Sequence, residues 1–143
     1  MLVRSILQGK GSVVVTVQAS TPLGDAVAVL RDRGIGALVV AGDDGGIDGI
    51  VSERDVVRAV ATHGVGALGR LVGSVMTRDV EVCSLDHTAD DLMRTMTDHR
   101  VRHLPVVDDG RLVGIVSIGD VVKARLGPLE DENRTLVGYL HGS

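Results

Sequence analysis

Aromatic side chains are almost absent from this 143-residue chain, which has no Trp, no Phe and one Tyr, Tyr139. Its core must therefore be aliphatic, and hydrophobic residues make up 44% of the chain, which is ample for one. Proteins that stack nucleic-acid bases need aromatic platforms. The formal net charge of -4 also argues against binding to a nucleic-acid backbone, because such binding needs a basic protein surface. We expect no nucleic-acid partner, although a single bound nucleotide is compatible with both facts.

Cysteine is equally scarce, since Cys83 is the only one. A single Cys excludes an intrachain disulfide and a thiolate metal cluster, and in a Val-rich segment it is typically a core residue. We expect no metal site, because the remaining His residues show no metal-like pairing: His63, His87, His99 and His141. The sequence has no apolar run of membrane-spanning length and no signal-peptide pattern at its start. We therefore expect a cytoplasmic protein with no membrane association.

A seven-residue phrase occurs twice in the chain. Residues 49–55 read GIVSERD and residues 114–120 read GIVSIGD. In each copy an apolar strand end precedes a Ser, and an Asp follows three residues later. Repetition at this length indicates a duplicated unit. A unit of about 55 residues buries too little surface to be stable alone, so we expect the two copies to pack together.

The apolar periodicity and the turn residues predict the same order of elements in both halves. The first half predicts a strand over 13–17, a helix over 21–34, strands over 37–41 and 47–51, and a helix over 52–61. The second half predicts a strand over 80–83, a helix from residue 88, strands over 104–107 and 112–116, and a helix from residue 117. A short helix is also predicted around residues 5–7, and the triplet 74–76 in the Gly-rich connection resembles it.

We therefore predict an α/β (α+β) fold of two β-α-β-β-α repeats that are related by a pseudo-twofold axis and packed through their sheets. The expected units are the first repeat with its lead-in (1–61), a linker (62–78), the second repeat (79–126) and a C-terminal helical tail (127–143). The tail region has heptad-like spacing at Leu126, Leu129, Asn133, Leu136 and Leu140. Such a helix either pairs with a second helix or lies on its own domain.

The repeated Ser-x-x-Asp has two interpretations. A Ser before a helix and an acid in its first turn form a capping box, which explains the spacing without any ligand. The same helix start presents free N–H groups and a carboxylate, which suit a phosphate and the hydroxyls of a ribose. The residues alone leave both interpretations open.

The duplicated order, the two Gly-Ile-Val-Ser-x-x-Asp phrases and the segment 101–107 (VRHLPVV) resemble the tandem cystathionine-β-synthase-type (CBS) domain pair, or Bateman module. The resemblance covers residues 5–126 and includes stand-alone bacterial proteins. It implies a homodimer that binds adenosyl ligands, such as AMP, ADP, ATP, NAD or S-adenosylmethionine, in clefts between the repeats. We favour AMP and expect no further cofactor.

In such modules each site combines the Ser-x-x-Asp of one repeat with the second-strand entry of the other. One implied site comprises Ile50, Ser52, Arg54, Asp55, Val80, Glu81, Val101, Arg102, His103 and Pro105. The other comprises Val14, Val15, Ile35, Gly36, Ala37, Ile115, Ser117, Gly119 and Asp120. Both sites face one cleft, so Arg102 and His103 would supply cationic groups for a phosphate in either site. Aliphatic side chains would enclose the adenine. If only one site fills, we expect the one with Asp120.

Paired acids at Asp43-Asp44 and Asp108-Asp109 fall in matching tight turns, where Asp is a common turn residue. No other group of residues suggests a catalytic site. We therefore expect a regulatory module that senses a nucleotide and signals to an unidentified protein partner, and not an enzyme. The alternative is a ligand-free interaction scaffold in which both Ser-x-x-Asp phrases are only helix caps.

Overall fold

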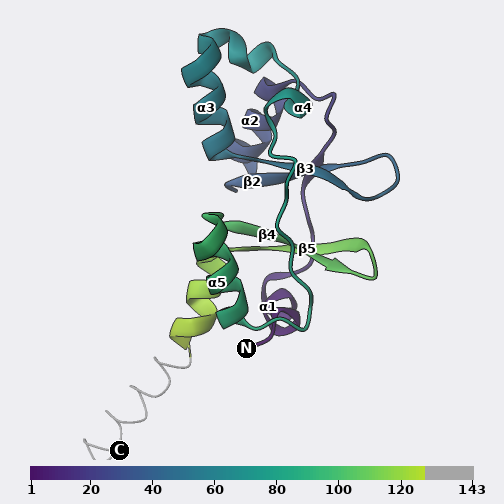
Figure 1. The fold of residues 1–143 in the computed structure, drawn as a ribbon, viewed down its shortest axis with the longest axis vertical. Helices are drawn as coiled ribbons and strands as arrows, with labels where there is room; N and C mark the ends of the chain where they lie inside the picture. Colours follow the sequence, from purple (N-terminus) through teal and green to yellow (C-terminus); the bar gives the residue numbers. More distant parts are fainter. Residues whose placement is uncertain (128–143) are drawn as a thin grey trace, which may run out of the picture.

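The computed structural model contains both helices and strands and describes residues 1–127 (Figure 1). The helices are α1 (Val3–Lys10), α2 (Leu23–Arg33), α3 (Glu53–His63), α4 (Val72–Val75) and α5 (Ala89–His99), with a 3₁₀ turn η1 (Gly64–Gly69). The strands are β1 (Thr16–Val17), β2 (Ala37–Ala41), β3 (Ile47–Ser52), β4 (His103–Asp108) and β5 (Arg111–Ser117). Residues 118–127 are helical. The heptad-like positions from Leu129 onward lie outside the described residues.

The strands form two small sheets, which confirms the mixed α+β fold. In the first, β1 runs parallel to β2 and β2 pairs antiparallel with β3; in the second, β4 pairs antiparallel with β5. The two sheets lie next to each other between two sets of helices, and both hairpin turns project on the same side (Figure 1). None of the helices in residues 1–127 has the length and apolarity needed to cross a bilayer.

Strand alternation gives each sheet two buried faces. Leu38 and Val40 on β2 pack in the core beneath the helices of the first half. Val39 between them is fully buried and points to the opposite face, because successive strand residues alternate. Its pairing partner there is Ile50, and Pro105 pairs with Ile115 in the same way on the second sheet. These residues are therefore placed where the two sheets meet.

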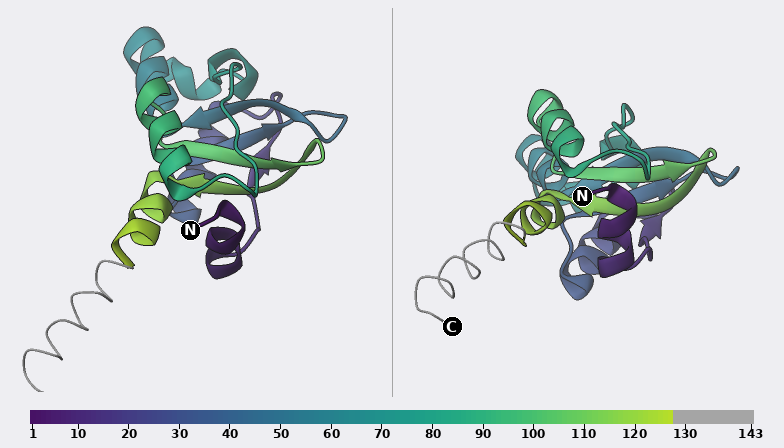
Figure 2. Two further views of the ribbon diagram at one scale, coloured as in Figure 1. Left: turned by 60° about the horizontal axis from the view of Figure 1, so that its bottom comes forward. Right: turned by 90° about the horizontal axis from the view of Figure 1, so that it is seen from below.

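The helix α1 belongs to the core of the second half, although it precedes the first half in sequence. Val3, Ile6 and Leu7 are buried in the cluster that also contains Leu92 and Leu104. Figure 2 shows α1 (purple) against the second hairpin (green) in both views. The connection between the halves precedes the second half in sequence but packs on the first, because Val72 of α4 lies in the core of the first half.

Two glycines show how closely these helices approach the strands. A Cβ atom at Gly49 would lie 2.7 Å from Met76 Sδ, and one at Gly114 would lie 2.8 Å from Leu7 Cδ1. Gly49 and Gly114 occupy the same position of the two repeats, 65 residues apart. The matching contacts show that α1 and the 72–76 segment have equivalent roles. Each packs on the repeat that is not its neighbour in that direction of the chain: α1 precedes the first repeat but packs on the second, and the 72–76 segment precedes the second repeat but packs on the first.

The predicted strand over 80–83 is wrong as a strand. Within the described residues, 80–82 belong to no strand, and Cys83 forms only an isolated parallel bridge with Val106. The Cys83 N–H donates to the Pro105 carbonyl and its carbonyl accepts from Val107 N–H, both at 2.9 Å. Burial raises the pKa of the Cys83 thiol to about 11, so this cysteine is an unreactive core residue.

Candidate functional site

The helix α3 begins at a complete capping box. Ser52 Oγ accepts a hydrogen bond from Asp55 N–H at 3.4 Å, and Asp55 Oδ2 accepts from Ser52 N–H at 2.9 Å. Asp55 Oδ2 also accepts from Ser52 Oγ, while Asp55 Oδ1 accepts from Thr77 Oγ1 at 3.0 Å. A carboxylate has about four acceptor positions, so Asp55 keeps capacity for one further donor.

A cavity of about 570 Å³ opens beside this capping box, between the two halves. We call it the Asp55 cavity. Its size is within the range of about 300–1,000 Å³ that is usual for small-molecule sites. Its lining residues come from both repeats and from the connection between them: Gly36, Ile50, Ser52, Glu53, Arg54, Asp55, Arg58, Thr77, Asp79, Val80, Glu81, His99, Arg100, Val101, Arg102 and His103.

Most residues implied for the first site line this cavity, namely Ile50, Ser52, Arg54, Asp55, Val80, Glu81, Val101, Arg102 and His103. Pro105 is not among the lining residues, because it lies further along β4 and is buried opposite Ile115. Gly36, which the sequence assigned to the second site, lines this cavity instead. A Cβ atom there would lie 3.2 Å from His103 Cε1, so glycine at this position makes room for the His103 ring.

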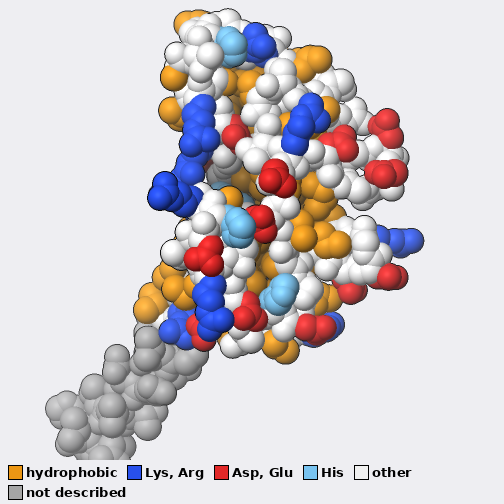
Figure 3. Space-filling model, viewed as in Figure 1, with side chains coloured by type: hydrophobic (Ala, Val, Ile, Leu, Met, Phe, Trp, Pro, Cys, Tyr) orange, Lys and Arg blue, Asp and Glu red, His pale blue; other side chains and the backbone are white. Residues whose placement is uncertain are grey.

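Charged groups of both signs surround the cavity. Arg54 of α3 crosses to the other half and donates from Nη1 to the Arg100 carbonyl at 3.0 Å. His99 Nδ1 lies 3.3 Å from Glu81 Oε1. Figure 3 shows Lys and Arg side chains (blue) along the edge where the halves meet, with acidic side chains (red) and His (pale blue) beside them. The arrangement can pair with a ligand that carries both donors and an anionic group.

Arg100 occupies an unusual backbone conformation. It ends α5 with φ 55° and ψ 43°, in the left-handed region. The equivalent residue at the end of α2, 66 positions earlier, is Gly34 with φ 63° and ψ 38°. Glycine is the usual residue here, because a Cβ disfavours this conformation. Arg100 nevertheless stands here and is among the residues that line the cavity.

His103 lies between the two implied sites. Burial lowers the pKa of its imidazole below the usual value, the positive charges of Lys10 and Arg102 act in the same direction, and Glu53 and Asp120 oppose them. The ring is therefore neutral at pH 7. The sequence predicted cationic groups at both 102 and 103; the lowered pKa of His103 leaves Arg102 as the charged member of the pair at pH 7.

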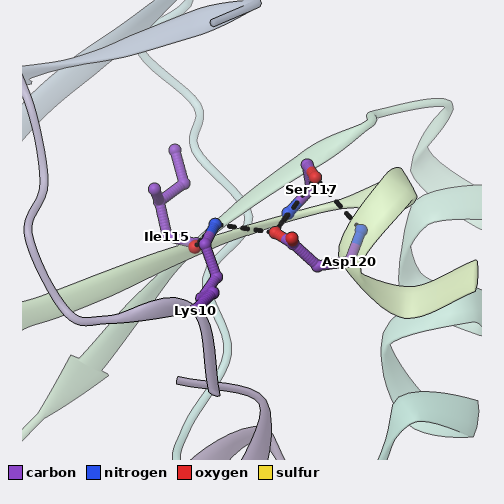
Figure 4. A network of polar contacts seen from close by, with 4 residues as sticks. All are labelled: Lys10, Ile115, Ser117 and Asp120. Carbon is purple, nitrogen blue, oxygen red and sulfur yellow. Dashed lines mark hydrogen bonds and ion pairs between the residues drawn. The ribbon is translucent and has the colours of Figure 1, made fainter. Parts of the chain in front are cut away.

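The second implied site contains a residue that the sequence did not point to. Lys10 Nζ donates to Asp120 Oδ2 at 2.7 Å and to the Ile115 carbonyl at 2.9 Å (Figure 4). Asp120 Oδ2 also accepts from Ser117 N–H at 2.9 Å, so the capping geometry resembles that of Asp55. Burial raises the pKa of the Asp120 carboxyl. The hydrogen bonds from Lys10 and Ser117 and the charge of Lys10 lower that pKa by more, so the net shift is downward.

The other residues implied for the second site have separate positions. Val14 and Val15 precede β1, Ile35 follows α2, and Ala37 begins β2. Gly119 lies in the first turn of the helix over residues 118–127, where a Cβ atom would meet only Ser117 Oγ at 3.6 Å. The structure therefore places Gly119 beside the Ser117 and Asp120 cap.

Sequence reasoning missed Lys10 and Thr77, which supply the third donor to Asp120 and to Asp55. The resemblance between segments 5–7 and 74–76 was the available signal, since each segment leads into one of these donors. It could not show which half each segment covers. Among residues 1–127 no group of three His, Cys, Asp or Glu side chains is arranged to hold a metal ion.

The two repeats of the chain meet at one cavity and form a two-repeat module. The CBS domain family matches residues 11–62 and 72–127, and the chain belongs to this family. The CBS-domain-containing protein ATU1752 from Agrobacterium tumefaciens has 47% sequence identity and a TM-score of 0.85, with 87% of this chain and 99% of that chain covered. The predicted fold and the predicted resemblance to a CBS domain pair are thus confirmed.

Two further proteins are similar to this chain. The CBS domain-containing protein CBSX3, mitochondrial, from Arabidopsis thaliana is 36% identical over 122 residues, which is 82% of this chain but only 59% of that protein. The CBS domain pair of protein MJ0100 was solved in complex with 5-methylthioadenosine and S-adenosyl-L-methionine. It has 26% identity and a TM-score of 0.80, with 90% of this chain and 98% of that chain covered.

Proposed function

We propose that this chain is a regulatory module that binds an adenosyl ligand in the Asp55 cavity and signals its presence to a protein partner. The observation that carries the proposal is the cavity itself, which is built from both repeats and combines aliphatic walls, a capped carboxylate and arginines. The MJ0100 pair, which has the same fold and was solved with two adenosyl ligands, supports the ligand class.

The cavity offers a place for each part of such a ligand. Ile50, Val80 and Val101 provide aliphatic surface on which an adenine ring can pack without aromatic side chains. Asp55 retains one acceptor position for a ribose hydroxyl. The phosphate of AMP fits beside Arg102, which can donate two parallel hydrogen bonds to it.

The test compares Asp55→Ala with Asp91→Ala. Asp91 forms the same capping box with Thr88 at the start of α5 but does not line the cavity, so it controls for loss of a cap. Both variants should lose about 1 kcal/mol of stability. Only Asp55→Ala should lose the thermal shift that AMP, ATP, NAD, 5-methylthioadenosine or S-adenosylmethionine gives to the unmodified chain. Ligand at 100 times its Kd should stabilise that chain by about 2.7 kcal/mol.

The alternative function is a ligand-free interaction scaffold. The observation that favours it is that the Ser52 and Ser117 caps are complete without a ligand. A scaffold predicts no thermal shift with any of these compounds at millimolar concentration, and equal behaviour of Asp55→Ala and Asp91→Ala. That pair of results would contradict the ligand-binding proposal.

We also propose that the chain forms a homodimer. Exposed aliphatic side chains on two helices support this: Val57 and Val60 on α3, and Val122 and Leu126 in the helix over 118–127. Both helices lie on the same side of the molecule (left in Figure 1). Sedimentation velocity should find a dimer whose population rises with concentration; a concentration-independent monomer would contradict it.

A further inference from the structure

Lys10 reaches the Asp120 capping box from the far end of the sequence. It is the last residue of α1, and Gly11 with φ 94° ends the helix after it. The Nζ atom contacts both Asp120 Oδ2 and the Ile115 carbonyl, and these two acceptors lie on different elements. The Lys10 side chain is 33% exposed and that of Asp120 is 17% exposed, so the ion pair is partly removed from water.

The helix α1 fixes the position of this lysine. Val3, Ile6 and Leu7 are buried in the core of the second half, and the Gly11 N–H donates to the Leu7 carbonyl at 2.8 Å. A surface lysine on a flexible segment loses entropy when it forms an ion pair. Here the packing of α1 has already restricted the backbone that carries Lys10.

Thr77 is the third donor to the Asp55 carboxylate, as Lys10 is to that of Asp120. Its Oγ1 donates to Asp55 Oδ1 at 3.0 Å, and its main chain exchanges two 2.9 Å hydrogen bonds with Ile50. Ile50 and Asp55 correspond to Ile115 and Asp120, 65 residues later. Both acceptors are thus engaged in each site, and the donors differ in charge. Thr77 uses a neutral hydroxyl and its main-chain N–H beside an open cavity, whereas Lys10 uses one ammonium group for both acceptors.

We propose that Lys10 makes the two sites unequal, so that the Asp55 cavity takes the adenosyl ligand while Lys10 occupies the Asp120 site, giving one ligand per chain. This inference rests on the proposed function. A ligand that uses the Ile115 carbonyl and the Asp120 carboxylate must displace an ammonium that makes charge-assisted hydrogen bonds to them. The order of filling is the reverse of the one expected from the sequence.

Calorimetric titration with AMP and with ATP tests the inference. The variant is Lys10→Met, which keeps most of the aliphatic stem and removes the charge. The matched control is Lys123→Met, because Lys123 is the other lysine of the chain and is exposed. The unmodified chain and Lys123→Met should bind one equivalent, and Lys10→Met should bind two. Adding Asp55→Ala should abolish binding in the unmodified background and leave one equivalent in the Lys10→Met background.

Two equivalents in the unmodified chain, or one in Lys10→Met, would overturn the role of Lys10 while leaving the proposed function intact. No binding to any variant would instead contradict the proposed function, and the inference with it. Acetylation kinetics give a readout without ligand, since mass spectrometry resolves the two lysines. Lys10 should react more slowly than Lys123 in the native chain and at a similar rate after unfolding; equal native rates would also overturn the inference.

Discussion

Gly34 and Arg100 end equivalent helices with nearly the same left-handed backbone, yet one has no side chain and the other has the longest cationic one. An L-residue in this conformation costs about 1–2 kcal/mol. Strain of this kind concentrates at functional positions, and Arg100 lines the Asp55 cavity. At the residue scale, we therefore expect the Arg100 side chain to contribute to ligand binding if the proposed function is right.

Arg100→Gly should therefore raise the free energy of unfolding by about 1 kcal/mol and weaken the binding of AMP. Urea denaturation and calorimetric titration measure the two effects. The reciprocal change, Gly34→Arg, should lower stability by a similar amount, and no atom lies within 4 Å of a Cβ at Gly34, so a clash would not be the cause. A destabilised Arg100→Gly would show that the arginine makes favourable folding contacts instead.

His103 should give stability a pH dependence of its own. Its folded-state pKa is below that of the unfolded chain because it is buried, so the unfolded state binds more protons as the pH falls below about 6.5. Stability should decrease over that range and level off below the folded pKa. Urea midpoints at several pH values for the native chain and for His103→Gln measure this, and the variant should lose part of the slope. Identical slopes would show that His103 does not contribute.

At the scale of elements, the position of α1 is the feature that the sequence did not predict. It precedes the first repeat but completes the core of the second. Leu7→Ala should therefore destabilise the chain by about 2–5 kcal/mol, as truncation of a buried Leu does. Val65→Ala is the control, since Val65 is 86% exposed and should change stability by less than about 0.5 kcal/mol. Thermal or urea unfolding compares them, and equal effects would mean that α1 contributes little to the core.

The element order was predictable wherever a local signal was strong. The helices at Glu53 and Ala89 begin directly after the predicted hydroxyl caps, Ser52 and Thr88. The helix predicted from Thr21 begins at Leu23 instead, after Pro22 and without a side-chain cap. The strand over 80–83 was not predictable, since its β-branched composition matches a strand while pairing is supplied only at Cys83. Strand propensity depends on neighbouring strands, and these lie far away in sequence.

At the scale of the whole molecule, the cavity also combines residues that a local sequence signal predicted with residues that only distant contacts reveal. The repeated phrases identified Ser52 and Asp55, and the segment from Val101 identified the opposite wall. Lys10 and Thr77 could not be found in this way, because their contacts depend on how α1 and the connection exchange places between the halves. Asp120 and Lys10 are 110 positions apart, and no local pattern relates them.

The exchanged position of α1 also constrains the order in which the chain can fold. Its partners are distant, since the Val3 N–H bonds to the His87 carbonyl at 2.9 Å and Lys10 to Asp120. Closing such long loops costs entropy, and folding slows as contacts become less local. At synthesis rates of about 5–20 residues per second, the apolar face of α1 is made on the order of ten seconds before Asp120 emerges. Val3, Ile6 and Leu7 therefore remain without the residues that bury them until the second half has been made.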